Sequence, residues 1–228
     1  GSYFPQKFTV FTNLLGDDGY SIGYTGKPWA PGNWEDAGWS RNPVGPEYNE
    51  HRLEPPFSGI KDFDYAANFA DFLSEKPQNS PFFFWYGCKE PHRDYEQGSG
   101  LETGKKLQNV KLPPFLPDKD YIKSDILDYA VAIDWFDQHL GKMIELLESR
   151  GELDNTMIVI TSDNGMPFPR AKANMYEYGT HMPLAVCWPA QMPGNRKISD
   201  MVSFIDFAPT FLEMAGLTPP TDMTGTSL

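Results

Sequence analysis

The feature that most constrains this chain is a short apolar run at residues 157–161 that gives way abruptly to Asp163 and Asn164. The run is too short for a buried helix and is rich in β-branched residues, so it predicts a β-strand covered on both faces. Open α/β sheets bind their ligands beyond the carboxyl ends of their strands. The carboxylate and the amide oxygen that follow this strand are therefore candidate ligands for a hard cation such as calcium or magnesium.

The same residues have a simpler interpretation. Asp-Asn-Gly after a strand is most often a plain turn, because Asn and Gly accept left-handed backbone and Asp caps it. Arg170 and Lys172 follow before a second apolar run, 183–188, resumes the sheet. Lys172 by itself has the character of a solvated surface lysine. Taken together, cation ligands followed by basic side chains suggest a site that holds an anion against a metal.

Length and charge restrict the classes of function. The 228 residues are enough for one sizeable core, and the formal net charge of −12 leaves no basic face for a nucleic acid. No apolar run is long enough to span a membrane, and the first residues lack the apolar core of a signal peptide. Cys88 and Cys187 each end a strand-like run, which favours buried thiols over a disulfide or a metal pair.

Hydrophobic periodicity divides the rest of the chain into helices and strands. Helices are predicted at 8–18, 62–76, 121–150 and 203–216, and strands at 20–24, 81–87, 157–161 and 183–188. The helix at 121–150 should connect strands 81–87 and 157–161 as parallel neighbours in a right-handed crossover. Residues 28–60 lack clean periodicity and are predicted to form an irregular surface excursion. The apolar stripe predicted for the long helix comprises Ile122, Ile126, Tyr129, Ile133, Phe136, Leu140, Met143 and Leu147.

Three of these strands end in charged or polar residues. Lys27 follows the first strand, His92 the second, and Asp163 and Asn164, with Lys172 further on, follow the third. A lone His92 is more often a locally hydrogen-bonded loop residue than a catalytic one. Convergence of separate loops on one sheet edge is stronger evidence for a site than any single residue.

These motifs together resemble the sulfatases of the alkaline phosphatase superfamily, and especially the sulfamidase (heparan N-sulfatase) branch. The most specific piece is residues 162–172, which read Ser-Asp-Asn-Gly-Met-Pro-Phe-Pro-Arg-Ala-Lys. Supporting pieces follow the family's order along nearly the whole chain: Gly23 to Lys27, Glu90-Pro91-His92, Tyr178-Gly179-Thr180, Val202 to Asp206 with Pro209-Thr210, and Gly225 to Leu228.

The resemblance implies an α/β fold in which helices sandwich a mixed, mostly parallel sheet. It implies hydrolysis of a sulfate ester or sulfamate on a sulfated carbohydrate, of the N-sulfoglucosamine type in this branch. Asp163 and Asn164 would ligate Ca²⁺, or Mg²⁺ in its place, while Lys27, His92 and Lys172 would bind the sulfate oxygens and the leaving group. Fixed positive charge and a general acid suit sulfuryl transfer. The implied location is periplasmic, lysosomal or secreted.

The sequence also departs from the family pattern. Sulfatases use a formylglycine made from Cys or Ser in a Cys/Ser-x-Pro-Ser-Arg motif, and neither Cys88 nor Cys187 has that context. The family's first pair of metal-binding aspartates has no counterpart, and Trp29 stands where many members have histidine. Residues 1–228 are therefore expected to be a single catalytic-domain fragment without the N-terminal strand, the nucleophile segment and the C-terminal subdomain, and to be inactive alone.

Two alternatives remain at this level. A descendant without catalysis would bind sulfated sugar through the same residues. A phosphodiesterase-like relative would use a two-metal site with more Asp and His ligands, and the four histidines of this chain argue against it. The sequence gives no indication of oligomeric state.

Overall fold

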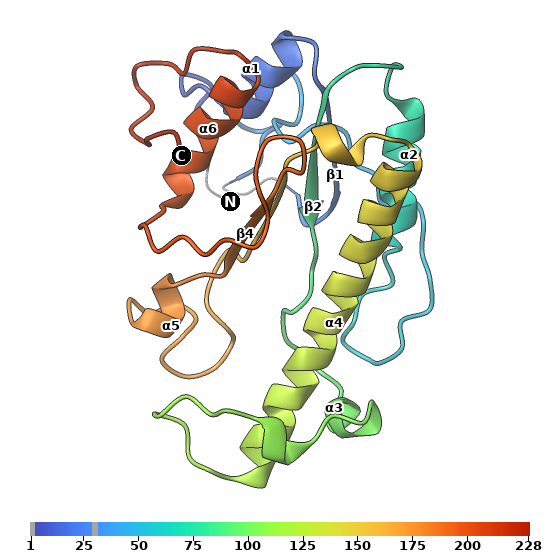
Figure 1. Cartoon of the computed structure of the whole chain (residues 1–228), viewed down its shortest axis with the longest axis vertical. Coiled ribbons are helices and arrows are strands. Elements are labelled where there is room, and N and C mark those ends of the chain that lie inside the picture. Colours follow the sequence, from blue (N-terminus) through green and yellow to red (C-terminus); the bar gives the residue numbers. More distant parts are fainter. Residues whose placement is uncertain (1–2, 29–31) are drawn as a thin grey trace. The chain divides into compact units, whose positions relative to one another are not determined.

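The computed structural model describes residues 3–28 and 32–228, so Trp29 lies outside the described residues. The chain divides into two compact units. The first unit comprises residues 1–51, 67–87 and 197–228, and the second comprises residues 52–66 and 88–196. Figure 1 shows the elements in chain order, from the N-terminal α1 to the C-terminal α6.

The first unit is built on a parallel pair of strands. Strands β1 (Ser21–Gly26) and β2 (Phe82–Gly87) pair in register from Ser21 with Phe82 to Gly26 with Gly87. The helices of this unit are α1 (Phe11–Asp17), most of α2 (Tyr65–Glu75) and α6 (Phe207–Met214), which a 3-10 turn (Phe204–Asp206) precedes. The predicted helices at 8–18, 62–76 and 203–216 are thus confirmed, with shorter bounds.

The alternation of side chains along β2 explains how these helices pack. Phe84 lies 4.8 Å, between ring centroids, from both Phe69 and Phe72 of α2. The preceding residue, Phe83, points to the opposite face of the strand pair and contacts Phe11 of α1 and Phe211 of α6. Because successive side chains of a strand point to opposite faces, the run of phenylalanines covers both faces of the pair.

A glycine permits the close approach of α2. A Cβ on Gly23 of β1 would lie 2.7 Å from the Phe72 ring, closer than side-chain carbons pack. The absence of a side chain at this position lets the ring lie directly against the strand. The family-like piece at residues 23–27 therefore contains a packing requirement in addition to its lysine.

The second unit contains the longest helix and an antiparallel pair of strands. Helix α4 (Asp120–Ser149) has 30 residues and confirms the clearest helical prediction. Strands β3 (Ile158–Thr161) and β4 (Leu184–Cys187) pair antiparallel, with Thr161 opposite Leu184. The short helices α3 (Ser99–Glu102) and α5 (Glu177–Thr180) complete the unit, together with 3-10 turns at Leu107–Asn109 and Leu153–Asn155.

The structure tests the expectations about the strands within each unit. The expected parallel pairing of β2 with β3 would join the two units and stays a prediction, while β2 pairs with β1 and β3 pairs with β4. After residues 162–183 the chain returns directly beside β3, and a return of this kind is antiparallel. All four residues of β3 are half-buried, and not fully covered as predicted. Strand β4 is the one strand partner of β3 in this part of the chain.

The two cysteines are free thiols, so the expectation that they form no disulfide is confirmed. Cys88 is half-buried, whereas Cys187 is exposed, contrary to the prediction of a buried thiol. The reason is that most of β4, which Cys187 ends, is itself exposed.

The combination of helices with one parallel and one antiparallel pair of strands confirms the α/β class. The described part of residues 28–60 contains no helix or strand and is irregular, as predicted. Among the described helices, none has both the length and the apolar character needed to cross a membrane.

Candidate functional site

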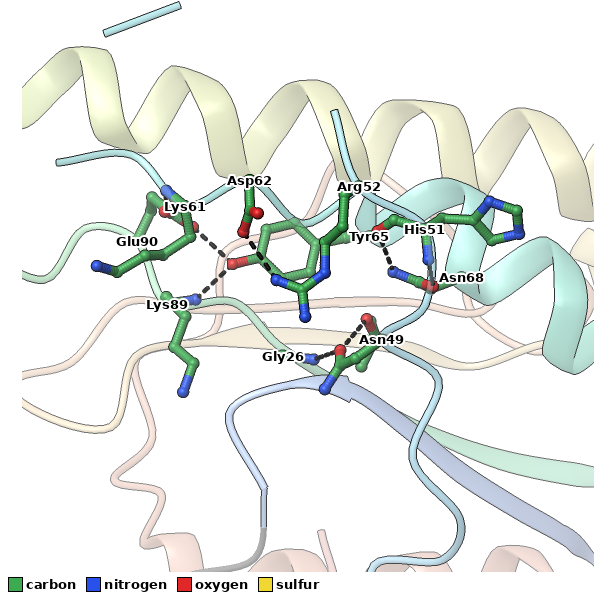
Figure 2. A network of polar contacts seen from close by, with 11 residues as sticks. Gly26, Asn49, His51, Arg52, Lys61, Asp62, Tyr65, Asn68, Lys89 and Glu90 are labelled. Atoms are coloured by element: carbon green, nitrogen blue, oxygen red, sulfur yellow. Dashed lines mark hydrogen bonds and ion pairs between the residues drawn. The ribbon is translucent and has the colours of Figure 1, made fainter. Parts of the chain in front are cut away.

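Lys27 lies directly after β1 in the first unit, and hydrogen bonds from neighbouring side chains hold the backbone at this point. The side-chain oxygen of Asn49 accepts hydrogen bonds from the Thr25 hydroxyl (3.0 Å) and from the backbone N–H of Gly26 (2.7 Å). The indole N–H of Trp85 donates to the carbonyl oxygen of Lys27 at 3.2 Å. Figure 2 shows how Asn49 reaches the end of β1. The Lys27 side chain is exposed at the end of a fixed strand.

The other predicted site residues lie in the second unit, on two segments. One is the excursion at residues 162–183, which connects β3 to β4. Its two ends are joined by a hydrogen bond of 2.8 Å from the Thr161 hydroxyl to the carbonyl oxygen of Pro183. The excursion folds back on itself so tightly that a Cβ on Gly165 would lie 2.2 Å from the carbonyl oxygen of Tyr178. This packing makes the excursion a compact structure.

Asp163 and Asn164 begin this excursion at the carboxyl end of β3. Asp163 is exposed, and Asn164 is half-buried with its amide nitrogen donating to the carbonyl oxygen of Gly165 at 3.0 Å. The Ser162 hydroxyl donates to the carbonyl oxygen of Asn164 at 2.9 Å. These local hydrogen bonds confirm that a turn forms here. They also leave the Asn164 side-chain oxygen without a hydrogen-bond donor among the described residues.

Lys172 is placed by the middle of the excursion. Its backbone N–H donates to the carbonyl oxygen of Met166 at 3.1 Å, and the preceding residue, Ala171, is completely buried. Phe168 is also buried, with 7% of its surface exposed. The Lys172 side chain is exposed. The exposed ammonium group of Lys172 therefore extends from a segment whose apolar side chains, Phe168 and Ala171, are buried.

The second segment, residues 88–95, carries His92 and is anchored on one side by Glu90. The buried Glu90 carboxylate accepts hydrogen bonds from the backbone N–H of Lys61 (2.7 Å), the Tyr65 hydroxyl (2.8 Å) and the Cys88 thiol (3.1 Å). The Tyr65 oxygen in turn accepts the backbone N–H of Lys89 at 3.0 Å. Burial raises the pKa of the Tyr65 hydroxyl, so it stays protonated and donates to Glu90. Figure 2 shows this cluster.

The other side of the segment is anchored by Arg93. Its guanidinium forms two hydrogen bonds to the Asp125 carboxylate of α4, at 2.9 and 2.7 Å. The pKa of Arg93 is raised, chiefly by these hydrogen bonds. The same guanidinium lies 4.9 Å from the ring centre of Tyr95 and 5.0 Å from that of Phe168. Arg93 is thus held by side chains of the second unit.

Phe168 belongs to the excursion that carries Asp163, Asn164 and Lys172, so its contact with Arg93 joins the two segments of the second unit. The Tyr129 ring of α4 packs edge-on against Phe168, with 5.7 Å between the ring centroids. The structure therefore brings the His92 segment against the Asp163–Lys172 segment. Lys27 belongs to the other unit.

The donor atoms after β3 are of the kind that a hard cation prefers. Asp163 supplies carboxylate oxygens and Asn164 an amide oxygen, and calcium binds about six to eight oxygens of this kind. The described residues contain no group of three or more His, Cys, Asp or Glu side chains suited to a metal. The chemistry of the two residues fits calcium or magnesium, and they would be a part of its ligand set.

Sequence reasoning did not identify Glu90, Tyr65 or Arg93 as organising residues. Glu90 stood in the Glu-Pro-His motif, two positions after Cys88, without a role of its own. Neither the Tyr65 nor the Arg93 contacts could be found, because their partners are 25 and 32 residues away in the sequence.

Comparison with known proteins agrees with this architecture. The chain is 39% identical over 105 residues to the N-acetylglucosamine-6-O-sulfatase of Bacteroides thetaiotaomicron, which covers 44% of this chain and 19% of that protein. It is 28% identical over 162 residues to human N-sulphoglucosamine sulphohydrolase, covering 61% of this chain and 32% of the relative. The chain thus spans about a fifth to a third of these two curated relatives.

A similar fold is found in a solved protein in complex with its substrate D-glucosamine-2-N,6-O-disulfate. The TM-score is 0.65 at 21% sequence identity, and the match covers 100% of this chain and 65% of that one. The sequence profile of the sulfatase family matches residues 2–217. The chain therefore belongs to the sulfatase family.

Proposed function

We propose that the protein containing this chain hydrolyses sulfate groups, as esters or sulfamates, on a glucosamine-type sulfated glycan. The observation that carries the proposal is the contact between Arg93 and Phe168, which brings the His92 segment against the segment of Asp163, Asn164 and Lys172. Both segments are independently anchored, so their side chains are presented from rigid backbone. A protein with this function is expected to be exported to the periplasm, the lysosome or the outside of the cell.

The roles of the residues follow from their charge and exposure. The exposed ammonium group of Lys172 would bind the negatively charged sulfate oxygens in the transition state. For Lys27 the same role is implied by the resemblance to the sulfatases alone. His92, also exposed, would donate a proton to the leaving oxygen or nitrogen of the sugar.

Asp163 and Asn164 would hold the calcium ion of the site. When bound, the cation would stabilise the charge on the sulfate oxygens. No cysteine or serine of this chain stands in a Cys/Ser-x-Pro-Ser-Arg motif, so the nucleophile is expected to come from outside these 228 residues. We propose accordingly that the 228 residues are one piece of a catalytic domain and show no turnover by themselves.

The substrate class is supported by the relatives. One of them is named for N-acetylglucosamine 6-O-sulfate and another for N-sulphoglucosamine, and the solved neighbour holds a glucosamine that carries both groups. Resemblance to the sulfamidase branch in residues 162–172 favours the N-linked sulfate. We therefore propose N-sulfoglucosamine in a glycan as the preferred substrate.

Sulfate release by the intact protein tests this proposal. N-sulfoglucosamine, 6-sulfated N-acetylglucosamine and an aryl sulfate are compared as substrates, before and after removal of calcium with a chelator. His92→Ala should lower kcat by about 10²- to 10⁴-fold, the usual contribution of a general acid. His51→Ala is the matched control, because His51 is also an exposed histidine with a carboxylate partner, Asp71 at 2.7 Å.

The possible outcomes separate the alternatives. If sulfate is released only from the 6-O-sulfated sugar, the protein is a sulfatase, but the proposed specificity for sulfamates is wrong. Saturable binding of the sugars without any turnover would identify a non-catalytic binder. Equal activity of the His92→Ala and His51→Ala variants would show that His92 takes no part in the reaction. Turnover by the isolated 228 residues at an enzymatic rate would show that the nucleophile lies within them.

A further inference from the structure

We propose that Arg93 is a positioning residue that fixes the protonation pattern of the His92 ring, and that Asp125 and Phe168 hold Arg93 in place for this purpose. The inference rests on the proposed function, because it assigns the ring nitrogen that His92 presents to the substrate. Neither Arg93 nor Asp125 would touch the substrate in this arrangement.

The first step is the contact between neighbouring residues. The Nδ1 atom of His92 is hydrogen-bonded to the backbone carbonyl oxygen of Arg93. A carbonyl oxygen only accepts hydrogen bonds, so Nδ1 must carry the proton. The ring therefore keeps its second nitrogen, Nε2, for the transferable proton. This is the tautomer that a general acid or base at Nε2 requires.

The second step concerns what holds the Arg93 carbonyl oxygen in position to accept the proton of His92 Nδ1. It is a loop carbonyl, and its position depends on the side chain of the same residue. That side chain forms two hydrogen bonds with the Asp125 carboxylate, a bidentate (two-point) pair, and it lies near the rings of Tyr95 and Phe168. Two-point pairs between arginine and a carboxylate are geometrically specific, which distinguishes this pair from a simple surface ion pair.

The third step concerns the other end of the segment. Glu90 accepts hydrogen bonds from the Tyr65 hydroxyl and from the backbone N–H of Lys61. His92 thus lies between two anchors, Glu90 before it and Arg93 after it. With the Glu90 anchor intact, loosening Arg93 should leave the segment folded while freeing the His92 ring to change its hydrogen bond.

Two substitutions in the intact protein test the inference. Asp125→Asn places an NH₂ group against the guanidinium where one carboxylate oxygen was, so it breaks the two-point pair. Arg93→Lys keeps the charge but cannot form that pair or lie flat on the rings. Each should lower kcat by about tenfold or more with little change in KM, because a catalytic group that is displaced loses rate and not substrate affinity.

The matched controls are Asp62→Asn and Arg52→Lys. Arg52 and Asp62 form a similar pair at 2.8 Å, and Arg52 lies 3.9 Å from the centre of the Phe63 ring. This pair is also an arginine–carboxylate ion pair beside an aromatic ring in the same unit, but it is joined by one hydrogen bond and not by two. The control variants should retain wild-type kcat.

A spectroscopic measurement distinguishes positioning from a general loss of structure. In ¹⁵N-histidine-labelled protein, the two ring nitrogens of His92 show by their chemical shifts which of them is protonated. The wild type should show protonated Nδ1, and the Asp125→Asn and Arg93→Lys variants should show a mixture of both tautomers. The resonances of His51, His139 and His181 should not move in these variants.

The outcomes are separable from those of the proposed function. If His92→Ala abolishes sulfate release but Asp125→Asn and Arg93→Lys keep wild-type kcat and protonated Nδ1, the positioning role is overturned and the sulfatase proposal stands. An equal loss of kcat in the Arg52 and Asp62 controls would also overturn it. If His92→Ala has no effect on sulfate release, the proposed role of His92 fails, whereas the spectra still test whether Arg93 sets the tautomer.

Discussion

The carboxylate of Asp128 in α4 accepts a hydrogen bond of 2.8 Å from the backbone N–H of Gly100 in α3. Its other oxygen accepts the backbone N–H of Gly98 at 3.0 Å, and Asp128 is 3% exposed. The residue at the start of α3 is Gly98, which has no side chain to cap the helix. A buried carboxylate from a different helix therefore satisfies the first N–H groups of α3.

Replacement of Asp128 by alanine should destabilise the protein. The change leaves two backbone N–H groups without an acceptor in a buried position, so the free energy of unfolding should fall by about 2–3 kcal/mol. Urea unfolding of the intact protein measures the effect. Asp137→Ala is the control, because Asp137 is an exposed aspartate of the same helix. A loss in the control as large as that in Asp128→Ala would show that the hydrogen bonds to α3 contribute nothing.

Glycine at position 165 is required by the folding back of the 162–183 excursion. In Gly165→Ala the new methyl group would overlap the carbonyl oxygen of Tyr178, which belongs to the backbone and cannot rotate away. The free energy of unfolding should fall by about 1–3 kcal/mol, the cost of forcing a group into occupied space. Thermal melting of the intact protein, with and without calcium, measures this change.

The control for this substitution is Gly141→Ala in α4. A Cβ on Gly141 has no neighbouring atom within 4 Å, and the residue lies inside a helix. Alanine there should stabilise the protein by about 0.5–1 kcal/mol, because glycine is a poor helix former. Opposite signs for the two substitutions are expected. If Gly165→Ala melts at or above the wild-type temperature, the excursion does not have this close packing.

The helix α4 illustrates how far the sequence alone could lead. Its bounds were predicted to within one residue at each end, since its periodicity and the glycine after it are local signals. Its buried face was predicted only in part: Met143 and Leu147 of the expected stripe are buried. The expected stripe included Ile133, which is 38% exposed, whereas Asp128 and His139 are buried. A hydrophobicity pattern counts polar residues as exposed, and it cannot anticipate acceptors or rings from other elements that make their burial favourable.

In the candidate site, too, some features could be predicted from the sequence and others could not. The candidate residues could be named from the sequence because they lie after strands in recognisable motifs, and their roles stay predictions. What holds them could not be named. The contact of Arg93 with Phe168 and that of Tyr65 with Glu90 join segments that are far apart in the sequence.

His139 is a buried histidine that the proposed reaction does not use. Its side chain is completely buried, and Nδ1 accepts a hydrogen bond of 3.4 Å from the backbone N–H of Ala66. Its Nε2 atom has no hydrogen-bond partner among the described residues. Burial lowers the pKa of His139 below its ordinary value of 6.5, and Lys142 adds to this, while Asp64 and Glu90 oppose it. The folded protein therefore holds this ring neutral.

Stability should consequently fall when the protein is acidified. Above pH 6.5 the ring is neutral in both the folded and the unfolded state, so His139 contributes no pH dependence. As the pH falls below that value, the unfolded chain binds a proton that the folded protein resists, and the free energy of unfolding decreases until the lowered folded pKa is passed. His139→Gln removes the titrating group but keeps an acceptor for the Ala66 N–H, so the slope below the ordinary histidine pKa of 6.5 should flatten. Urea unfolding at several pH values measures the slope, with His181→Gln, a change at an exposed histidine paired with Glu177, as the control. An unchanged slope in His139→Gln, or the same flattening in the control, would show that the acid sensitivity arises elsewhere.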